Sequence, residues 1–304
     1  MLAATAAAAL LAACSSTSPP RAAAAPGPRP VVIASFNFPE SELLARIYAD
    51  ALGHAGVPVR LELDLGPREM VMPALRQGLV DLVPEYLGSA LAAVDPTAGS
   101  GDGPAPSAGV ERDQLAAALA PWHVDVLTPA AAENQNGLAV TEATARRYRL
   151  STTSDLAAVA SRMTLGGPSE CPTRPYCLVG FRSVYGLSFA RFTAFDAEAQ
   201  RVAALDQGVV DAAVMFTTDG ELGTGRFVLL ADDRHLQRPE NVTPVVSARV
   251  LAAYGGRVGT TLDRVSALLT TPGLVFLNWR IGPGGKEVAA EARGWLQRQG
   301  LLPR

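Results

Sequence analysis

Hydrophobic and polar positions change period several times between residues 31 and 83, and the pattern predicts three strands separated by two helices. The strands are expected at residues 31–34, 59–65 and 80–83, and the helices at residues 39–55 and 67–77. Pro39 suits the first position of its helix, and Gly56 and Gly78 suit the ends of the two helices. This order is typical of a parallel α/β unit.

The same reading predicts a second α/β unit further along the chain. Residues 95–109 have the composition of a loop, and segments 130–140 and 241–247 are interpreted as the crossings into a second lobe and back. Strands are expected near residues 123–127, 163–167, 209–216 and 226–230. Helices are expected near residues 114–120, 144–148, 154–161 (with Ser154 as N-cap), 188–195, 197–207, 262–269 and 286–299.

One stretch occurs twice. Residues 74–83 (ALRQGLVDLV) return as residues 204–213 (ALDQGVVDAA), 130 positions later, and both copies soon reach an aromatic residue, Tyr86 and Phe216. The repetition indicates two equivalent halves. The alternative is two unrelated helix–turn–strand joints, each with a glycine at the end of its helix.

Length and composition bound the possible classes of protein. A chain of 304 residues suits two lobes, and a hydrophobic content of 48% allows a sizeable core. The net charge of −3 provides no electrostatic footprint for nucleic acid.

The N-terminus predicts export and anchoring. Residues 1–13 form an apolar, small-residue run that suits a signal peptide of the lipoprotein type, and Leu11-Ala12-Ala13-Cys14 resembles a bacterial lipobox. Cys14 is then the lipidated residue, residues 14–30 are a flexible tether, and the protein is held at the outer face of the cytoplasmic membrane. No Lys or Arg precedes the run, in contrast to most such peptides. The alternative is an apolar terminus with a chance cysteine.

The two remaining cysteines, Cys171 and Cys177, flank a proline-rich segment. Outside the cytoplasm such a pair is most simply a disulfide. A metal site is disfavoured, because no histidine lies near the pair and a zinc site needs more ligands.

Seven short motifs follow one another in a familiar order. They are Ser35–Glu40 (SFNFPE), Gly66–Glu69 with Ala74-Leu75, Asp81–Ser89 (DLVPEYLGS), Asn134–Val140 (NQNGLAV), Gly166–Glu170 with Arg174, Asp211–Gly220 (DAAVMFTTDG) and Val228–Asp233. Together they resemble the periplasmic-type substrate-binding proteins of osmoprotectant (glycine betaine, choline, carnitine) ABC transporters. The likeness spans residues 31 to 271.

The resemblance implies an α/β protein of the bilobed, type II periplasmic-binding-protein (Venus-flytrap) architecture, with two parallel-sheet lobes joined by a hinge. Residues 31–133 plus 238–304 are expected to form lobe 1, and residues 134–237 lobe 2. The implied partners are a small solute and ABC permease subunits, with no cofactor, and the protein is expected to be a monomer. Closure is expected by rotation near residues 133–136 and 230–245.

The resemblance also implies a binding site. A quaternary ammonium has no N–H to donate, so aromatic faces bind it by cation–π attraction, and a bidentate arginine suits a carboxylate on the same solute. Tyr86 and Phe216 are the implied aromatic walls and Arg174 the implied carboxylate clamp. The full set of implied ligand-binding residues is Phe36, Asn37, Tyr86, Ser89, Asn134, Asn136, Arg174, Phe216 and Thr218.

Other readings of these residues stay open. Tyr86 and Phe216 also suit core positions, and Arg174 also suits a solvated loop. Glu85 is expected to pair with an arginine inside its lobe, and Asp219 to serve a turn. Phe36 and Phe38 are either core or a wall of the site.

Two departures from the family pattern affect the expected cage. Phe36 stands where the family often has Lys, and residues 238–241 contain no aromatic residue. Either Phe36 or Tyr176 completes the cage differently, or the solute is not a simple betaine.

An enzyme is not expected. The three histidines have no nucleophile or carboxylate at a telling spacing, and no G-x-S-x-G, P-loop or H-E-x-x-H motif occurs. The competing function is a lipoprotein of the same fold that senses a solute or scaffolds partners, with a different small ligand.

Overall fold

The computed structural model describes residues 29–98, 106–195, 197–282 and 286–303. The expected signal peptide, Cys14 and all of the tether before Arg29 lie outside the described residues. Among the described residues, no helix is both long and apolar enough to cross a membrane.

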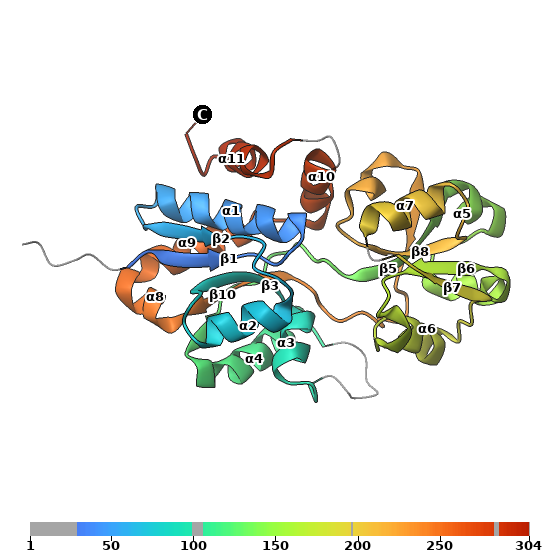
Figure 1. Cartoon of the computed structure of the whole chain (residues 1–304), viewed down its shortest axis with the longest axis horizontal. Helices are drawn as coiled ribbons and strands as arrows, with labels where there is room; N and C mark the ends of the chain where they lie inside the picture. Colours follow the sequence, from blue (N-terminus) through green and yellow to red (C-terminus); the bar gives the residue numbers. More distant parts are fainter. Residues whose placement is uncertain (1–28, 99–105, 196, 283–285, 304) are drawn as a thin grey trace, which may run out of the picture.

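Two five-stranded sheets lie side by side, each in its own lobe (Figure 1). The first sheet has the order β2-β1-β3-β10-β4, and the second has the order β7-β6-β8-β5-β9. The strands of the first are β1 (Val31–Ala34), β2 (Val59–Glu62), β3 (Leu82–Tyr86), β4 (Val124–Val126) and β10 (Val242–Ser247). Those of the second are β5 (Asn136–Thr141), β6 (Thr164–Gly167), β7 (Arg191–Ala194), β8 (Ala212–Phe216) and β9 (Phe227–Leu230).

Each sheet is mixed, in contrast to the parallel sheets expected from the sequence, because each contains one antiparallel strand. In the first, β1 runs parallel to β2 and β3, whereas β10 is antiparallel to β3 and β4. In the second, β6 runs parallel to β7 and β8, whereas β5 is antiparallel to β8 and β9. The antiparallel strand in each sheet is the one that the chain enters on crossing from the other lobe. The segment read from sequence as the return crossing, residues 241–247, is thus almost entirely β10, and the return crossing lies before it, at residues 231–241.

Helices cover both faces of the first sheet. They are α1 (Pro39–His54), α9 (Gly256–Ser266) and α11 (Val288–Arg298) on one side, and α2 (Arg68–Arg76), α3 (Leu87–Val94) and α4 (Ala108–Leu119) on the other (Figure 1). α8 (Ala248–Tyr254) follows β10, and α10 (Thr271–Ile281) lies beside the second lobe. A short 3-10 turn, η1 (Ala120–Trp122), precedes β4. A single apolar cluster fills this lobe, and its fully buried members include Tyr48, Leu82 and Leu115.

The second lobe has a smaller core on each face of its sheet. Phe181 and Tyr185 of α6 (Leu178–Tyr185) pack on one face, while Val202 and Leu205 of α7 (Glu198–Asp206) pack on the other. The remaining elements are α5 (Glu142–Tyr148) and the 3-10 turns η2 (Thr153–Ala158), η3 (Ala160–Arg162), η4 (Cys171–Thr173) and η5 (Gly220–Thr224). The expected disulfide between Cys171 and Cys177 is formed, with Cα atoms 5.2 Å apart.

The repeated stretch has the same backbone in both lobes. Gly78 and Gly208 each end a helix with φ of +69°, a conformation that glycine adopts without strain. The Asp81 carboxylate accepts a hydrogen bond from the Val32 amide at 3.0 Å. Asp211 accepts one from the Thr164 amide at 2.8 Å, in the equivalent place on β6. The repetition is therefore structural, with each aspartate tying its strand to the parallel neighbour.

Two crossings and one helix connect the lobes. The crossings run beside each other, with Glu133 bridged to Asn241 and the Asn134 amide 3.0 Å from the Glu240 carbonyl oxygen. The helix is α10, on which Asn278 donates to the Thr218 carbonyl oxygen of the second lobe at 2.8 Å. The sequence pattern did not predict this third connection.

Several predicted elements differ in the structure. The helix predicted at residues 188–195 is wrong: this segment contains β7, and the helix comes earlier as α6, which Gly186 ends with φ of +68°. Residues 191–194 (RFTA) carry aromatic and β-branched side chains that suit an edge strand beside β6. The predicted helix at 154–161 is the 3-10 turn η2, capped by Thr152 and not by Ser154. α3, α8 and α10 were not predicted.

Candidate functional site

An aromatic wall lies at the carboxyl ends of β1 and β3 in the first lobe. Tyr86, the last residue of β3, is 4% exposed, and Phe38, directly before α1, is 38% exposed. Their ring centroids are 6.2 Å apart. Phe36 is buried and stacks on Phe38 at 5.9 Å, and the Arg68 guanidinium lies over the Phe36 ring at 5.0 Å. Phe38, not Phe36, therefore presents the accessible ring.

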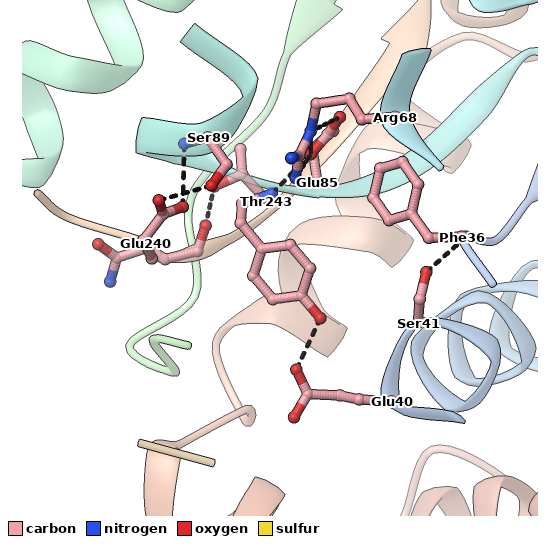
Figure 2. Close-up of polar contacts among 10 residues, drawn as sticks. Phe36, Glu40, Ser41, Arg68, Glu85, Ser89, Glu240 and Thr243 are labelled. Atoms are coloured by element: carbon pink, nitrogen blue, oxygen red, sulfur yellow. Dashed lines mark hydrogen bonds and ion pairs between the residues drawn. The ribbon is translucent and has the colours of Figure 1, made fainter. Parts of the chain in front are cut away.

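The Tyr86 hydroxyl donates a hydrogen bond to Glu40 Oε1 at 2.6 Å, and Figure 2 shows the Glu40 carboxylate turned toward a ring hydroxyl. Burial and the adjacent Glu40 carboxylate raise the pKa of Tyr86 well above its usual value, so the phenol keeps its proton. The ring is thus held by β3 at one end and by α1 at the other.

Glu85 does pair with an arginine inside its lobe, as the sequence reading favoured. Arg68 Nε and Nη2 each donate to the fully buried Glu85 carboxylate at 3.1 Å, a bidentate ion pair that is visible in Figure 2. Glu85 Oε2 also accepts from the Tyr86 amide at 3.0 Å. The charge of Glu85 is therefore used in fixing the strand end.

Ser89 contacts a carboxylate of the return crossing. Its hydroxyl donates to Glu240 Oε1 at 2.7 Å and its amide donates to Glu240 Oε2 at 3.1 Å (Figure 2). Burial raises the pKa of Glu240 to about 7, although the two bonds from Ser89 act in the opposite direction. Nothing in the local sequence singles out Glu240, because its partner Ser89 lies 151 residues away in the chain.

The structure places the remaining expected site residues at several different positions. Asn134 belongs with the aromatic wall, because its Nδ2 donates to Glu40 Oε1 at 2.8 Å. Asn136 and Phe216 face each other as partners in the β5–β8 ladder. Phe216 is half-buried, with the Arg201 guanidinium 5.8 Å from its ring centroid. The Thr218 side chain is buried.

Asn37 and Arg174 are both exposed. Arg174 follows η4 inside the disulfide-bridged loop, and Asn37 lies between Phe36 and Phe38. In the same loop the Tyr176 carbonyl oxygen accepts from Gln237 Nε2 at 3.0 Å, so the loop is tied to the return crossing.

Acidic groups of the second lobe lie near the wall. Burial and the neighbouring Glu198 carboxylate raise the pKa of Asp219 well above its usual value. Burial also raises the pKa of Glu198. The Asp219 carboxylate accepts from the Phe216 amide at 2.9 Å, which supports the structural role expected for it.

A cavity of about 160 Å³ lies in the second lobe beside the crossings. Asn136, Thr217 and Gln237 are among its lining residues, whereas Tyr86, Phe38 and Phe216 are not. The cavity is therefore separate from the aromatic wall. In the described part of the chain, no group of three His, Cys, Asp or Glu residues is arranged to hold a metal ion.

Comparison with known proteins identifies the family. Residues 29–298 match the OpuAC family, described as the substrate-binding domain of ABC-type glycine betaine transport systems. The chain belongs to this family. OpuAC members are substrate-binding proteins of ABC importers and not enzymes, and such binding proteins work outside the cytoplasm.

Individual relatives are similar over most of their length. The glycine betaine-binding protein YehZ of Escherichia coli K12 is 26% identical over 287 residues, which cover 89% of this chain and 91% of the relative. A solved structure of apo YehZ has a TM-score of 0.75 and covers 90% of this chain and 99% of that one.

A crystal structure described as a glycine betaine/carnitine/choline ABC transporter has a TM-score of 0.79 at 22% identity, over 89% of this chain and 99% of that one. These neighbours have the bilobed type II periplasmic-binding-protein fold. The expected α/β architecture is thereby confirmed.

Proposed function

We propose that this protein captures a quaternary-ammonium osmoprotectant, betaine- or choline-like, between its lobes and delivers it to an ABC permease. The observation that carries the proposal is the aromatic wall of Phe38 and Tyr86 with a buried carboxylate on the Tyr86 hydroxyl. Tetra-alkylated nitrogen offers no hydrogen-bond donor but carries a diffuse positive charge. Aromatic faces backed by negative charge attract such a group.

The relatives support this solute class. By their names, YehZ binds glycine betaine and the OpuCC protein of Listeria monocytogenes takes part in carnitine transport. Both names describe solutes with a trimethylated or similarly quaternised nitrogen and a carboxylate. Exposed Arg174 remains our candidate for the carboxylate end, with Asn37, Ser89, Asn134, Asn136 and Thr218 as candidate polar contacts.

We further propose that the lobes close on the solute. Lobe 1 is taken as residues 31–133 plus 238–304, lobe 2 as residues 134–237, and rotation occurs in the paired crossings near residues 133–136 and 230–245. Closure brings Phe216 and Arg174 toward the wall of Phe38 and Tyr86. The solute needs only enough differential affinity for the closed form to overcome the open–closed difference.

The remaining parts of the proposal concern place and partners. Cys14 is proposed to carry a lipid that holds the mature protein at the outer membrane surface, with residues 14–30 as a tether. The proposed partner is the permease of the same importer, and the binding protein acts as a monomer.

A ligand panel tests the solute class. The change in melting temperature is measured with choline, glycine betaine, carnitine, proline betaine and uncharged polyols. At least one quaternary ammonium is expected to raise the melting temperature saturably, whereas polyols leave it unchanged. A response to polyols alone contradicts the proposal.

A matched pair of variants locates the site. Tyr86→Phe retains the ring and removes only the hydroxyl bond, so it is expected to weaken solute binding. Tyr148→Phe, at the end of α5 and packed against the core of the second lobe, is expected to change nothing. Equal affinities for both variants would remove Tyr86 from the site.

A further inference from the structure

Glu40 is a buried carboxylate that lies directly behind the aromatic wall. It is 6% exposed, and each of its three side-chain partners donates to it. The Tyr86 hydroxyl and Asn134 Nδ2 donate to Oε1, at 2.6 and 2.8 Å, and Asn278 Nδ2 donates to Oε2. Both oxygens of the Glu40 carboxyl group are therefore used as acceptors by protein donors.

The first turn of α1 favours that negative charge. Pro39 occupies the start of the 16-residue helix and Glu40 follows it, where unpaired backbone N–H groups and the helix dipole stabilise an anion. Asn278 also donates to the Thr218 carbonyl oxygen, so the carboxylate is held where α10 joins the two lobes.

In the described part of the chain, no basic side chain forms an ion pair with Glu40. The ion pairs of residues 29–98, 106–195, 197–282 and 286–303 engage other acids, such as Glu85 with Arg68 and Glu111 with Arg238, and none engages Glu40. Buried charges in proteins are usually paired, so a buried anion with donors but no cation is an incomplete arrangement.

Asp219 and Glu198 are acids of the second lobe that interact electrostatically with Glu40. The raised pKa values of Asp219 and Glu198 favour their protonated forms, and the negative charge of Glu40 contributes to both shifts. These directions are consistent with negative charge at Glu40, whose carboxylate contacts Tyr86.

We infer that Glu40 is a specificity-determining positioning residue that makes the site select a solute with a permanent positive charge. It acts through Tyr86: the hydroxyl bond fixes the ring and shifts electron density toward its face, and the carboxylate supplies the missing counter-charge from behind. The inference rests on the proposed function. A neutral solute of the same shape gains the packing contact but not the electrostatic one.

The test compares a cation with its uncharged carbon isostere. Choline and 3,3-dimethylbutan-1-ol are titrated calorimetrically into the wild-type protein, Glu40→Gln and Glu42→Gln. Glu42 is the matched control, because it lies on the same turn of α1 but pairs with Arg46 at 2.9 Å. We expect Glu40→Gln to lower the choline affinity about tenfold, a Coulomb effect across a low-dielectric wall, while the affinity for the alcohol changes less than about twofold. Glu42→Gln should change neither.

The possible outcomes distinguish a failure of the proposed function from a failure of the charge role of Glu40. A wild-type protein that binds no quaternary ammonium contradicts the proposed function itself. A protein that binds choline but loses equal affinity for both ligands in Glu40→Gln, or loses none, contradicts the charge role alone. Should Glu40→Gln fail to fold, Tyr86→Phe breaks the same contact. The ratio of choline to alcohol affinity must then fall about threefold, since the ring and its packing remain; an unchanged ratio overturns the inference.

Discussion

At the scale of single residues, Phe38 and Tyr86 differ strongly in solvent exposure. The difference distinguishes a ring that a solute can contact from a ring that supports the wall of the site. Phe38 is 38% exposed and offers a face to a solute, whereas Tyr86 is 4% exposed and is fixed by Glu40. Truncating each residue therefore has a different expected effect.

Phe38→Ala should weaken quaternary-ammonium binding with little loss of stability. The ring contributes about 0.5–2 kcal/mol of cation–π attraction, or roughly 2- to 30-fold in affinity. Isothermal titration with the best solute of the panel measures the affinity, and thermal unfolding measures the stability. Val179→Ala, an exposed apolar truncation on α6, is the control. Unchanged affinity in Phe38→Ala would exclude the ring from the site.

Glu240 should make stability depend on pH. Its pKa is raised from 4.5 to about 7 in the folded protein, so the folded state binds the proton more tightly than the unfolded state does. Its stabilising contribution is complete below about pH 4.5 and is lost as pH rises through 7, by at most about 3 kcal/mol.

Denaturant unfolding at several pH values tests this dependence. Glu240→Gln should flatten the decline in the free energy of unfolding between pH 4.5 and 7. Glu42→Gln should leave that decline unchanged. The same slope in wild type and Glu240→Gln would show that Glu240 does not carry the effect.

At the scale of elements, α10 is connected to the second lobe through a contact that only glycine permits. A Cβ at Gly220 would lie 2.4 Å from the backbone nitrogen of Trp279, which is closer than non-bonded atoms can approach. Gly223 lies on the same turn, and a Cβ there would meet Val275 at an ordinary 3.4 Å.

Gly220→Ala should therefore destabilise the protein by about 1–3 kcal/mol through overpacking, and Gly223→Ala by much less. Urea unfolding of the two variants measures the difference. Equal stabilities would mean that α10 moves away from η5 without loss.

The elements also show what local patterns can predict. β1, α1 and α2 were predictable because apolar periodicity, Pro39 and Gly78 all act within a few residues of chain. α6 and β7 were misplaced, because RFTA becomes a strand only by pairing with β6, and a local window does not contain that partner. α10 has two exposed aromatic residues, Phe276 and Trp279, which obscure its helical pattern.

The candidate site could likewise be predicted only where its residues lie in local sequence motifs. Tyr86, Ser89 and Asn134 lie in motifs, and the structure brings each to a carboxylate. Glu240 contacts Ser89 and Asn278 contacts Glu40 from far along the chain, so only the tertiary structure reveals these two residues.

At the scale of the whole molecule, the two lobes are similar halves joined by paired crossings and by α10. The equivalent aspartates of the repeat tie each sheet internally, so each lobe is expected to move as a rigid body. We therefore expect the hinge to be the pair of crossings, where Glu133 is bridged to Asn241.

Small-angle X-ray scattering of the wild-type protein, titrated with the quaternary ammoniums of the panel, tests this account most directly. A solute that raises the melting temperature should also reduce the radius of gyration saturably, over the same concentration range, because the lobes close on it. A radius of gyration that stays constant while a quaternary ammonium saturates the protein, or that falls only with uncharged polyols, would contradict capture of such a solute between the lobes.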